Sequence, residues 1–308
     1  MYNKDDYLII SNEKDKSLAR TISQSTNILL GELSVKKING SETVIKLNSH
    51  VNNKKIFLLY NITQPVNESI MQILHIADIL KKNGAKEISL VCPYMPYTKS
   101  PINLDYYSNT NLIARLIEEC KINYIYTFDL YSNLIISTFR IPVYNVSLKK
   151  LFSDVLYDFS FKKGLVVTTA DYELEGKAQK VAKEINCEFI NIINKTKKQN
   201  YNFKLESSVN NKEILIIANT IDTAKTLINL SNYLTLKGAR KIYILATHGI
   251  FSEDAIERIE KSVINKIFIA TASKQKISPK IKVLNKSKIL IELIERTIEN
   301  KNIFSFIS

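Results

Sequence analysis

Short apolar runs alternate with longer amphipathic segments along most of the chain. The runs are rich in isoleucine, leucine and valine, as in strands that are buried on both faces of a sheet. The segments between them repeat their apolar positions with the period of a helix. Strands that alternate with helices predict parallel sheets covered by helices on both faces, and so an α/β fold.

This alternation occurs twice in the same order. Residues 54–98 read as a strand, a loop, an amphipathic helix, a Gly-Ala-basic turn and a second strand, and residues 211–252 read the same way. The parallel continues with KINYIYTFDL at Lys121, which matches VINKIFIATA at Val263. The internal repeat therefore predicts two similar α/β domains with mainly parallel sheets.

The two domains are expected to span residues 1–145 and 146–308. The last helix, from about Ile289, is expected to pack back on the N-terminal domain. A polar segment over residues 194–211 is longer than a typical connection in such folds, so we expect a loop or hairpin there.

The first candidate site follows the apolar run at Ile214, in the sequence ILIIANTIDTAKTL. This pattern predicts a strand, a loop over Thr220–Thr226 and a helix that starts near Leu227. A helix N-terminus presents unpaired N–H groups to an anion, so the loop is a candidate phosphate site. Such loops usually carry glycines that let a phosphate approach the backbone, whereas Ala224 and Lys225 stand here.

The formal net charge of +13 raises the question of a nucleic-acid partner. Arginine is scarce, whereas lysine, asparagine and isoleucine abound, which is the residue usage of an AT-rich genome. The lysines occur in scattered pairs, such as Lys36–Lys37 and Lys162–Lys163, rather than along one helical stripe. We therefore interpret the charge as a solvated surface and expect no nucleic-acid partner.

Composition indicates a soluble globular protein of the cytoplasm, since 45% of the 308 residues are hydrophobic. No apolar run reaches the roughly 18 residues that a membrane-spanning helix needs, so no membrane association is expected. The start, MYNKDDYLII, lacks the pattern of a secretory signal. Cys92, Cys120 and Cys187 are scattered and match no metal or redox spacing, which fits a reducing compartment.

Five segments together carry a resemblance to a known family: GAKEISLVCPYMPY, TFDLYSN, VVTTAD, TIDTAKTL and ATHGIFS. These segments occur in the order of the ribose-phosphate pyrophosphokinase family, also called phosphoribosyl diphosphate synthetases, and with nearly its spacing. The chain resembles that family over essentially its full length. The resemblance implies a pair of phosphoribosyltransferase-like α/β domains that assemble as dimers and hexamers. It also implies Mg²⁺-dependent transfer of the diphosphoryl group of ATP to the 1-hydroxyl of ribose 5-phosphate.

In this resemblance, the loop from Asp222 to Thr226 corresponds to the ribose 5-phosphate site. The family's segment reads Val-Asp-Asp-Met-Ile-Asp-Thr-Gly-Gly-Thr. The loop residues at its end are here Asp222, Thr223, Ala224, Lys225 and Thr226. The acidic pair is replaced by Ala218-Asn219, and the glycine pair by Ala224-Lys225. Sugar-binding carboxylates and room for the phosphate are therefore expected to be lost.

The resemblance assigns metal binding to Asp129 and Asp171. Asp129 begins the family's Asp-Leu-His metal motif, in which Tyr131 takes the histidine position, and a neutral phenol is a poor Mg²⁺ ligand. Asp171 matches the acid of the family's Ser-Pro-Asp. Both aspartates could instead cap local turns at strand ends.

The same resemblance assigns ATP binding to Glu42, Lys99 and Ser100, and the catalytic lysine to Lys195. Of the family's Phe-x-Asp-Gly-Glu, only Glu42 remains. Lys99 replaces an arginine and keeps its charge without the planar fork that holds a phosphate. Lys195 starts a lysine-rich loop, so an incidental match is an open alternative. His248, after a buried strand, is a further candidate because α/β folds bind ligands at that end of the sheet.

These losses predict a catalytically impaired or silent homologue that acts as a regulatory or associated subunit in nucleotide biosynthesis, because phosphoryl transfer relies on positioned ligands. Its expected partners are further copies of itself in a dimer or hexamer, an intact synthetase subunit, and phosphate-containing small molecules. The alternative is an active ribose-phosphate diphosphokinase that uses Mg²⁺, with lysines in place of the missing groups.

Overall fold

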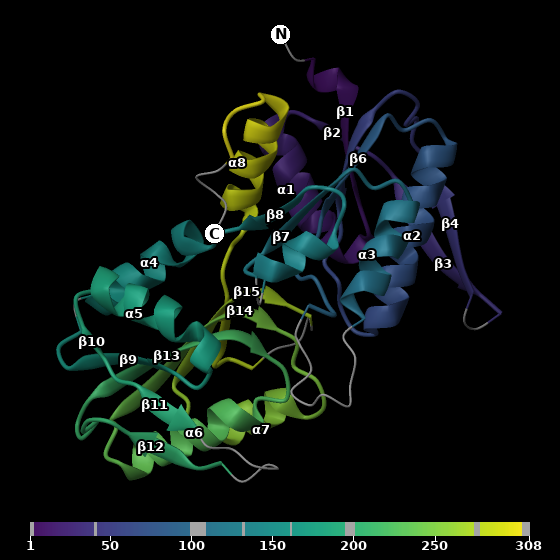
Figure 1. Cartoon of the computed structure of the whole chain (residues 1–308). Coiled ribbons are helices and arrows are strands. Elements are labelled where there is room, and N and C mark those ends of the chain that lie inside the picture. Colours follow the sequence, from purple (N-terminus) through teal and green to yellow (C-terminus); the bar gives the residue numbers. More distant parts are fainter. Residues whose placement is uncertain are drawn as a thin grey trace. The chain divides into compact units, whose positions relative to one another are not determined.

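The computed structural model describes residues 3–39, 42–98, 109–130, 133–160, 162–194, 201–273 and 278–303. The chain divides into two compact units (Figure 1). The first unit contains the chain up to Ser147 and again from Lys286 onwards, and the second runs from Leu148 to Asn285. Among the helices of the described residues, none combines the length and apolar character that a membrane crossing needs.

The first unit is built on a parallel sheet with the strand order β2-β1-β5-β6-β7-β8. Its strands are β1 (Tyr7–Ser11), β2 (Leu29–Leu30), β5 (Lys55–Leu59), β6 (Glu87–Val91), β7 (Tyr124–Phe128) and β8 (Val143–Val146). Its helices are α1 (Lys16–Thr26), α2 (Val66–Lys82), α3 (Thr110–Glu119) and α8 (Ser287–Ile298). An antiparallel hairpin, β3 (Leu33–Ile38) and β4 (Glu42–Leu47), stands between β2 and β5 in the chain. Short 3-10 turns are η1 (Lys4–Asp6), η2 (Glu13–Asp15) and η3 (Asn133–Thr138).

The second unit repeats this plan, with the parallel strand order β10-β9-β13-β14-β15-β16. Its strands are β9 (Leu165–Thr169), β10 (Glu188–Phe189), β13 (Glu213–Ile221), β14 (Lys241–Gly249), β15 (Lys266–Ala272) and β16 (Ile281–Val283). Its helices are α4 (Lys149–Ser160), α5 (Glu175–Glu184), α6 (Lys225–Leu236) and α7 (Ala255–Lys261), with a 3-10 turn η4 (Tyr172–Leu174). A second antiparallel hairpin, β11 (Ile192–Asn194) and β12 (Phe203–Leu205), occupies the equivalent place in the chain. The predicted α/β class and the two parallel sheets are confirmed.

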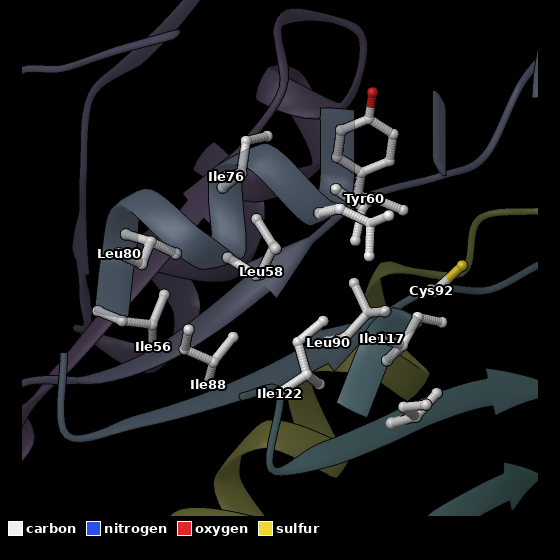
Figure 2. Packing of buried hydrophobic residues seen from close by; sticks show 14 of the residues in the cluster. Ile56, Leu58, Tyr60, Ile76, Leu80, Ile88, Leu90, Cys92, Ile117 and Ile122 are labelled. Atoms are coloured by element: carbon white, nitrogen blue, oxygen red, sulfur yellow. The ribbon is translucent and has the colours of Figure 1, made fainter. Parts of the chain in front are cut away.

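Both faces of each sheet are covered, which is why the central strands are apolar at successive positions. In β5, Ile56 and Leu58 belong to the core cluster under α2 and α3, and the alternate residue Phe57 points to the opposite face. Figure 2 shows Ile56 and Leu58 facing Ile76 and Leu80 of α2. Burying such side chains is the main favourable contribution to the stability of each unit.

The helix that follows the last strand of each sheet belongs to the other unit. After β8 the chain enters α4, where the ring of Phe159 packs edge-on against Tyr243 of the second unit, with ring centroids 5.0 Å apart. After β16 it enters α8, which packs against α1 of the first unit. There the Thr297 hydroxyl donates to the Tyr126 hydroxyl at 3.3 Å. The two units therefore share one plan, and each receives one helix from beyond the other's sheet.

The repeat extends to single hydrogen bonds at the turn after the central helix. The N–H of Asn53 donates to the carbonyl of Gly84 at 2.8 Å, and the N–H of Asn211 donates to that of Gly238 at 2.8 Å. Gly84 has φ +85° and Gly238 has φ +92°, values that L side chains rarely adopt. The Gly-Ala-basic turn seen twice in the sequence is thus a backbone requirement of the fold.

We expect Gly238→Ala to destabilise the second unit by roughly 2 kcal/mol or more. The left-handed backbone alone costs an L residue about 1–2 kcal/mol, and the new Cβ would lie 2.4 Å from Asn210 Oδ1 and 3.2 Å from its Cα. Gly164→Ala is the matched control, because Gly164 has φ +72° but nothing within 4 Å of its added Cβ. Urea unfolding of both variants measures the difference; equal midpoints would show that the close approach carries no weight.

Candidate anion-binding site

Each sheet has one position where the strand order reverses, between β1 and β5 in the first unit and between β9 and β13 in the second. In open α/β sheets, ligands bind outside the carboxyl ends of the strands at such a point. The loop after β13 lies at this position. The segment that joins β13 to α6 is therefore the candidate site.

The loop after β13 is shorter than the sequence predicts. Thr220 and Ile221, expected in the loop, pair with His248 and Gly249 of β14 and so belong to the strand. The helix α6 begins at Lys225, two residues before the expected start, which leaves only 222–224 as the loop. Strand pairing with β14 overrides the turn preference of the polar residues here.

Ala224, the residue before α6, adopts the left-handed conformation, with φ 61° and ψ −2°. Its methyl group is buried in the core cluster of the second unit, and α6 has no side-chain cap at this end. Glycine adopts this conformation without strain, and for alanine it costs about 1–2 kcal/mol. Burial of the methyl group opposes this cost.

The loop side chains and carbonyls are held by neighbouring elements. The Asp222 carboxylate accepts a hydrogen bond from the Ser252 hydroxyl. Arg258 Nη1 of α7 donates to the Thr223 carbonyl at 2.7 Å. On the other side, the hydroxyl of Thr226 lies 3.3 Å from the Tyr201 hydroxyl. Two of the side chains expected to bind a sugar phosphate, those of Asp222 and Thr226, therefore have partners within the protein.

A single carboxylate neutralises much of the positive charge at the loop. Glu253 Oε2 lies 3.1 Å from Lys225 Nζ and 2.8 Å from Arg258 Nη2. Hydrogen bonds, first from Lys225 and then from Arg258, hold the pKa of the Glu253 carboxyl below its usual range. Glu253 is therefore ionised at neutral pH and forms ion pairs with both cations.

Asp171, at the end of β9 beside β13, acts as a local cap. Its carboxylate accepts the N–H of Glu173 at 3.2 Å, and its own N–H donates to the Thr169 hydroxyl at 3.1 Å. The neighbouring strand positions contribute no acid: Ala218 carries no polar group, and the Asn219 side-chain oxygen accepts from the Thr220 hydroxyl at 2.9 Å.

His248 is buried at the end of β14, next to Thr220 in the register of the sheet. Its Nδ1 lies 2.9 Å from the Thr271 hydroxyl of β15. The side chain is thus placed by the strand pairing at the carboxyl edge, with a hydrogen bond that orients the ring.

In the first unit, Asp129 and Glu42 lie on separate elements. Asp129 follows β7 with φ +41° and is buried, and Glu42 is the exposed first residue of β4. The Glu42 carboxylate accepts from Asn39 Nδ2 at 3.4 Å. Lys99, Ser100 and Lys195 lie outside the described residues.

Few carboxylates stand at the strand ends around this loop to hold Mg²⁺. A magnesium ion prefers carboxylate and water oxygens in an octahedron. Among the residues that the structure describes, no group of three His, Cys, Asp or Glu side chains gathers as a metal centre. Asp171 uses its carboxylate to cap η4, and its strand neighbours Ala218 and Asn219 provide no carboxylate.

In the first unit, the loop after β5 corresponds to the loop after β13, and the carboxylate of Asp15 binds its backbone. Asp15 is buried, and its Oδ2 accepts the N–H of Asn61, just after β5, at 2.7 Å. Burial raises the pKa of Asp15 to about 6, an effect opposed by that hydrogen bond and by the charge of Lys286. Burial in turn lowers the pKa of Lys286.

Comparison with known proteins agrees with this architecture. The family profile for the N-terminal domain of ribose phosphate pyrophosphokinase matches residues 7–119, and the profile for the phosphoribosyl synthetase-associated domain matches residues 173–307. The ribose-phosphate pyrophosphokinase of Fusobacterium nucleatum is 28% identical over 98% of both chains. That of Campylobacter jejuni is 27% identical over 97% of this chain and 98% of its own.

The chain belongs to the ribose-phosphate pyrophosphokinase family. The crystal structure of phosphoribosylpyrophosphate synthetase from Mycobacterium smegmatis has the same fold, with a TM-score of 0.85 over 96% of this chain and 99% of that one at 22% identity. Fold and alignment therefore span both units of this ribose-phosphate pyrophosphokinase homologue.

Sequence reasoning missed two residues at the loop of this pyrophosphokinase homologue, Glu253 and Arg258. Both follow β14, whose carboxyl end lies beside that of β13. The available signal was the position of the charged segment SEDAIERIE directly after a buried strand. Parallel strands bring their following loops to one edge, so charges there face the loop after β13.

We expect Ala224→Gly to change the free energy of unfolding by less than about 1 kcal/mol. Relief of the left-handed strain, worth about 1–2 kcal/mol, opposes the loss of a buried methyl, about 0.8 kcal/mol, and the entropy of glycine. Ala246→Gly is the control, because Ala246 is an equally buried alanine within β14. It should cost about 1–2 kcal/mol more in the same urea titration; equal costs would contradict strain at Ala224.

Asp15→Asn should flatten the pH dependence of stability. The folded-state pKa of Asp15 is raised from 3.8 to about 6, so its contribution is fully present below the unfolded value and is lost as pH rises through about 6. Between pH 4 and 7.5, the wild type should lose up to about 3 kcal/mol relative to the variant. Asparagine keeps an oxygen for the N–H of Asn61.

Urea unfolding across this pH range measures the effect. The control is Asp78→Asn, which removes a half-exposed carboxylate on α2 in the same unit. A pH profile of Asp15→Asn parallel to that of the wild type would contradict a raised pKa.

Proposed function

We propose that this ribose-phosphate pyrophosphokinase homologue is catalytically impaired and acts as an associated or regulatory subunit, with a loop that retains only weak phosphate binding. The observation that carries the proposal is the state of the loop after β13. Lys225 stands where a glycine would admit a phosphate, and its charge is paired with Glu253 at 3.1 Å. Its relatives are ribose-phosphate pyrophosphokinases by name, so the sugar phosphate and ATP are the substrates to test.

Weak anion binding is supported by the backbone of the loop. The N-terminus of α6 has no side-chain cap, and its first N–H groups have no partner within the helix. The helix dipole favours an anion there whatever the side chains are. Tight binding of a sugar phosphate is opposed by Ala218 and Asn219, which provide no carboxylate for the sugar hydroxyls.

Association is supported by apolar side chains exposed near α3 of the first unit. Leu112 and Leu116 lie one turn apart on α3 and are 46% and 39% exposed, and Leu134 on η3, which contacts α3, is 80% exposed. Exposed leucines on two elements that contact each other are candidates for a protein contact. The proposed partner is a second copy of this chain or an intact synthetase subunit.

Purified protein incubated with ribose 5-phosphate, ATP and Mg²⁺ should release AMP no faster than its Lys195→Ala variant. The physical reason is that each lost positioned group costs about 10²–10³ in rate, and several are lost together. A coupled assay for AMP measures both proteins side by side. An intact family member run in parallel shows that the assay detects the reaction.

Robust AMP release that disappears in the Lys195→Ala variant would overturn the proposal and establish the alternative, an active Mg²⁺-dependent ribose-phosphate diphosphokinase. If instead the protein is silent, mixing it with an intact synthetase tests the subunit role. A change in the rate or assembly size of the synthetase would support it.

A further inference from the structure

Glu253 forms ion pairs with two cations at the loop after β13. One of its carboxylate oxygens contacts both Lys225 Nζ, at 3.1 Å, and Arg258 Nη2, at 2.8 Å. Lys225 is the first residue of α6, and Arg258 also donates to the Thr223 carbonyl at 2.7 Å. The carboxylate thus bridges two cations that both belong to the loop, where a phosphate oxygen would make the same contacts.

The backbone holds Glu253 in this place. The turn after β14 is fastened to the end of β13, because the N–H groups of Ile250 and Phe251 donate to the Ile221 carbonyl at 2.8 and 3.2 Å. Phe251 and Glu253 both have positive φ, at 54° and 50°. These values are uncommon for side chains other than glycine. The fold of the turn therefore places the backbone of Glu253 beside the loop, and its ion pairs place the carboxylate.

The ion pairs of Glu253 with Lys225 and Arg258 are partly exposed to solvent. The side chains of Lys225 and Glu253 are 48% and 50% exposed, and that of Arg258 is 29% exposed. Ion pairs exposed to this degree are weak and are screened by salt. An external anion can therefore compete with the carboxylate, but it meets cations that are already paired.

We propose that the Glu253 carboxylate competes with external anions at the loop after β13. By holding Lys225 and Arg258 in ion pairs, it lowers the affinity of the loop for phosphate. This inference rests on the proposed function, in which the loop retains weak phosphate binding. The ligand class is a phosphate monoester or inorganic phosphate. Removing the charge of Glu253 frees both cations without altering the backbone of the loop.

Calorimetric titration with inorganic phosphate, at constant ionic strength, tests this on the full-length protein. Glu253→Gln should bind phosphate about fivefold more tightly than the wild type, the size of one exposed ionic contact. The matched control is Glu188→Gln, since Glu188 pairs with Lys212 at the amino end of β13 and its loss changes the net charge equally. This control should bind like the wild type, and the double variant Glu253→Gln/Lys225→Gln should lose the gain.

The outcomes separate the two proposals. If the wild type binds phosphate and Glu253→Gln binds it no more tightly than Glu188→Gln, the competition by Glu253 is overturned and the weak phosphate site stands. If none of the variants binds phosphate, the site itself is overturned, and the role of Glu253 with it. Thermal unfolding of each variant without phosphate confirms that the compared proteins are folded.

Discussion

Burial of both faces of a parallel sheet governs the rest of this molecule. Helices cover each sheet on two sides, so the strands are apolar and their hydrogen bonds are used up within the sheet. Polar chemistry is then confined to the edges, where the strands end. At the carboxyl edge of the second unit, this brings together the loops after β9, β13 and β14, and with them Asp171, Asp222 and Glu253.

The elements that recur in the sequence could be predicted because each copy meets the same physical demand. The Gly-Ala-basic turn is needed at Gly84 and Gly238 because the backbone there has positive φ. The asparagine shared by KINYIY and VINKIF has a comparable role. Asn123 Oδ1 accepts the N–H of Ile88, and Asn265 Oδ1 accepts that of Ile242, at 2.9 and 2.8 Å. Because the same local requirement fixes the same residue in both copies, it can be recognised from a single sequence.

The candidate site was less predictable because its state depends on contacts between distant segments. In the sequence, Lys225 stands where a glycine would admit a phosphate, and only the fold shows that Glu253 pairs with it. The length of the loop depends likewise on the pairing of Thr220 with His248. For Asp171 the sequence left a metal ligand and a local cap open, and the fold shows that its carboxylate caps η4. Residue identity indicated where a candidate site is to be expected, and the partners decide what each side chain can do.

The exchange of helices between the two units bears on how the chain reaches its folded state during synthesis. The sheet of the first unit is complete once β8 has been made, but α8, which packs on α1, lies at the far end of the sequence. Domains generally fold in order as they leave the ribosome. Here α8 can join α1 only after the whole second unit has been translated, so the apolar side chains that α8 covers stay exposed in the nascent chain longer than the rest of the first unit's core.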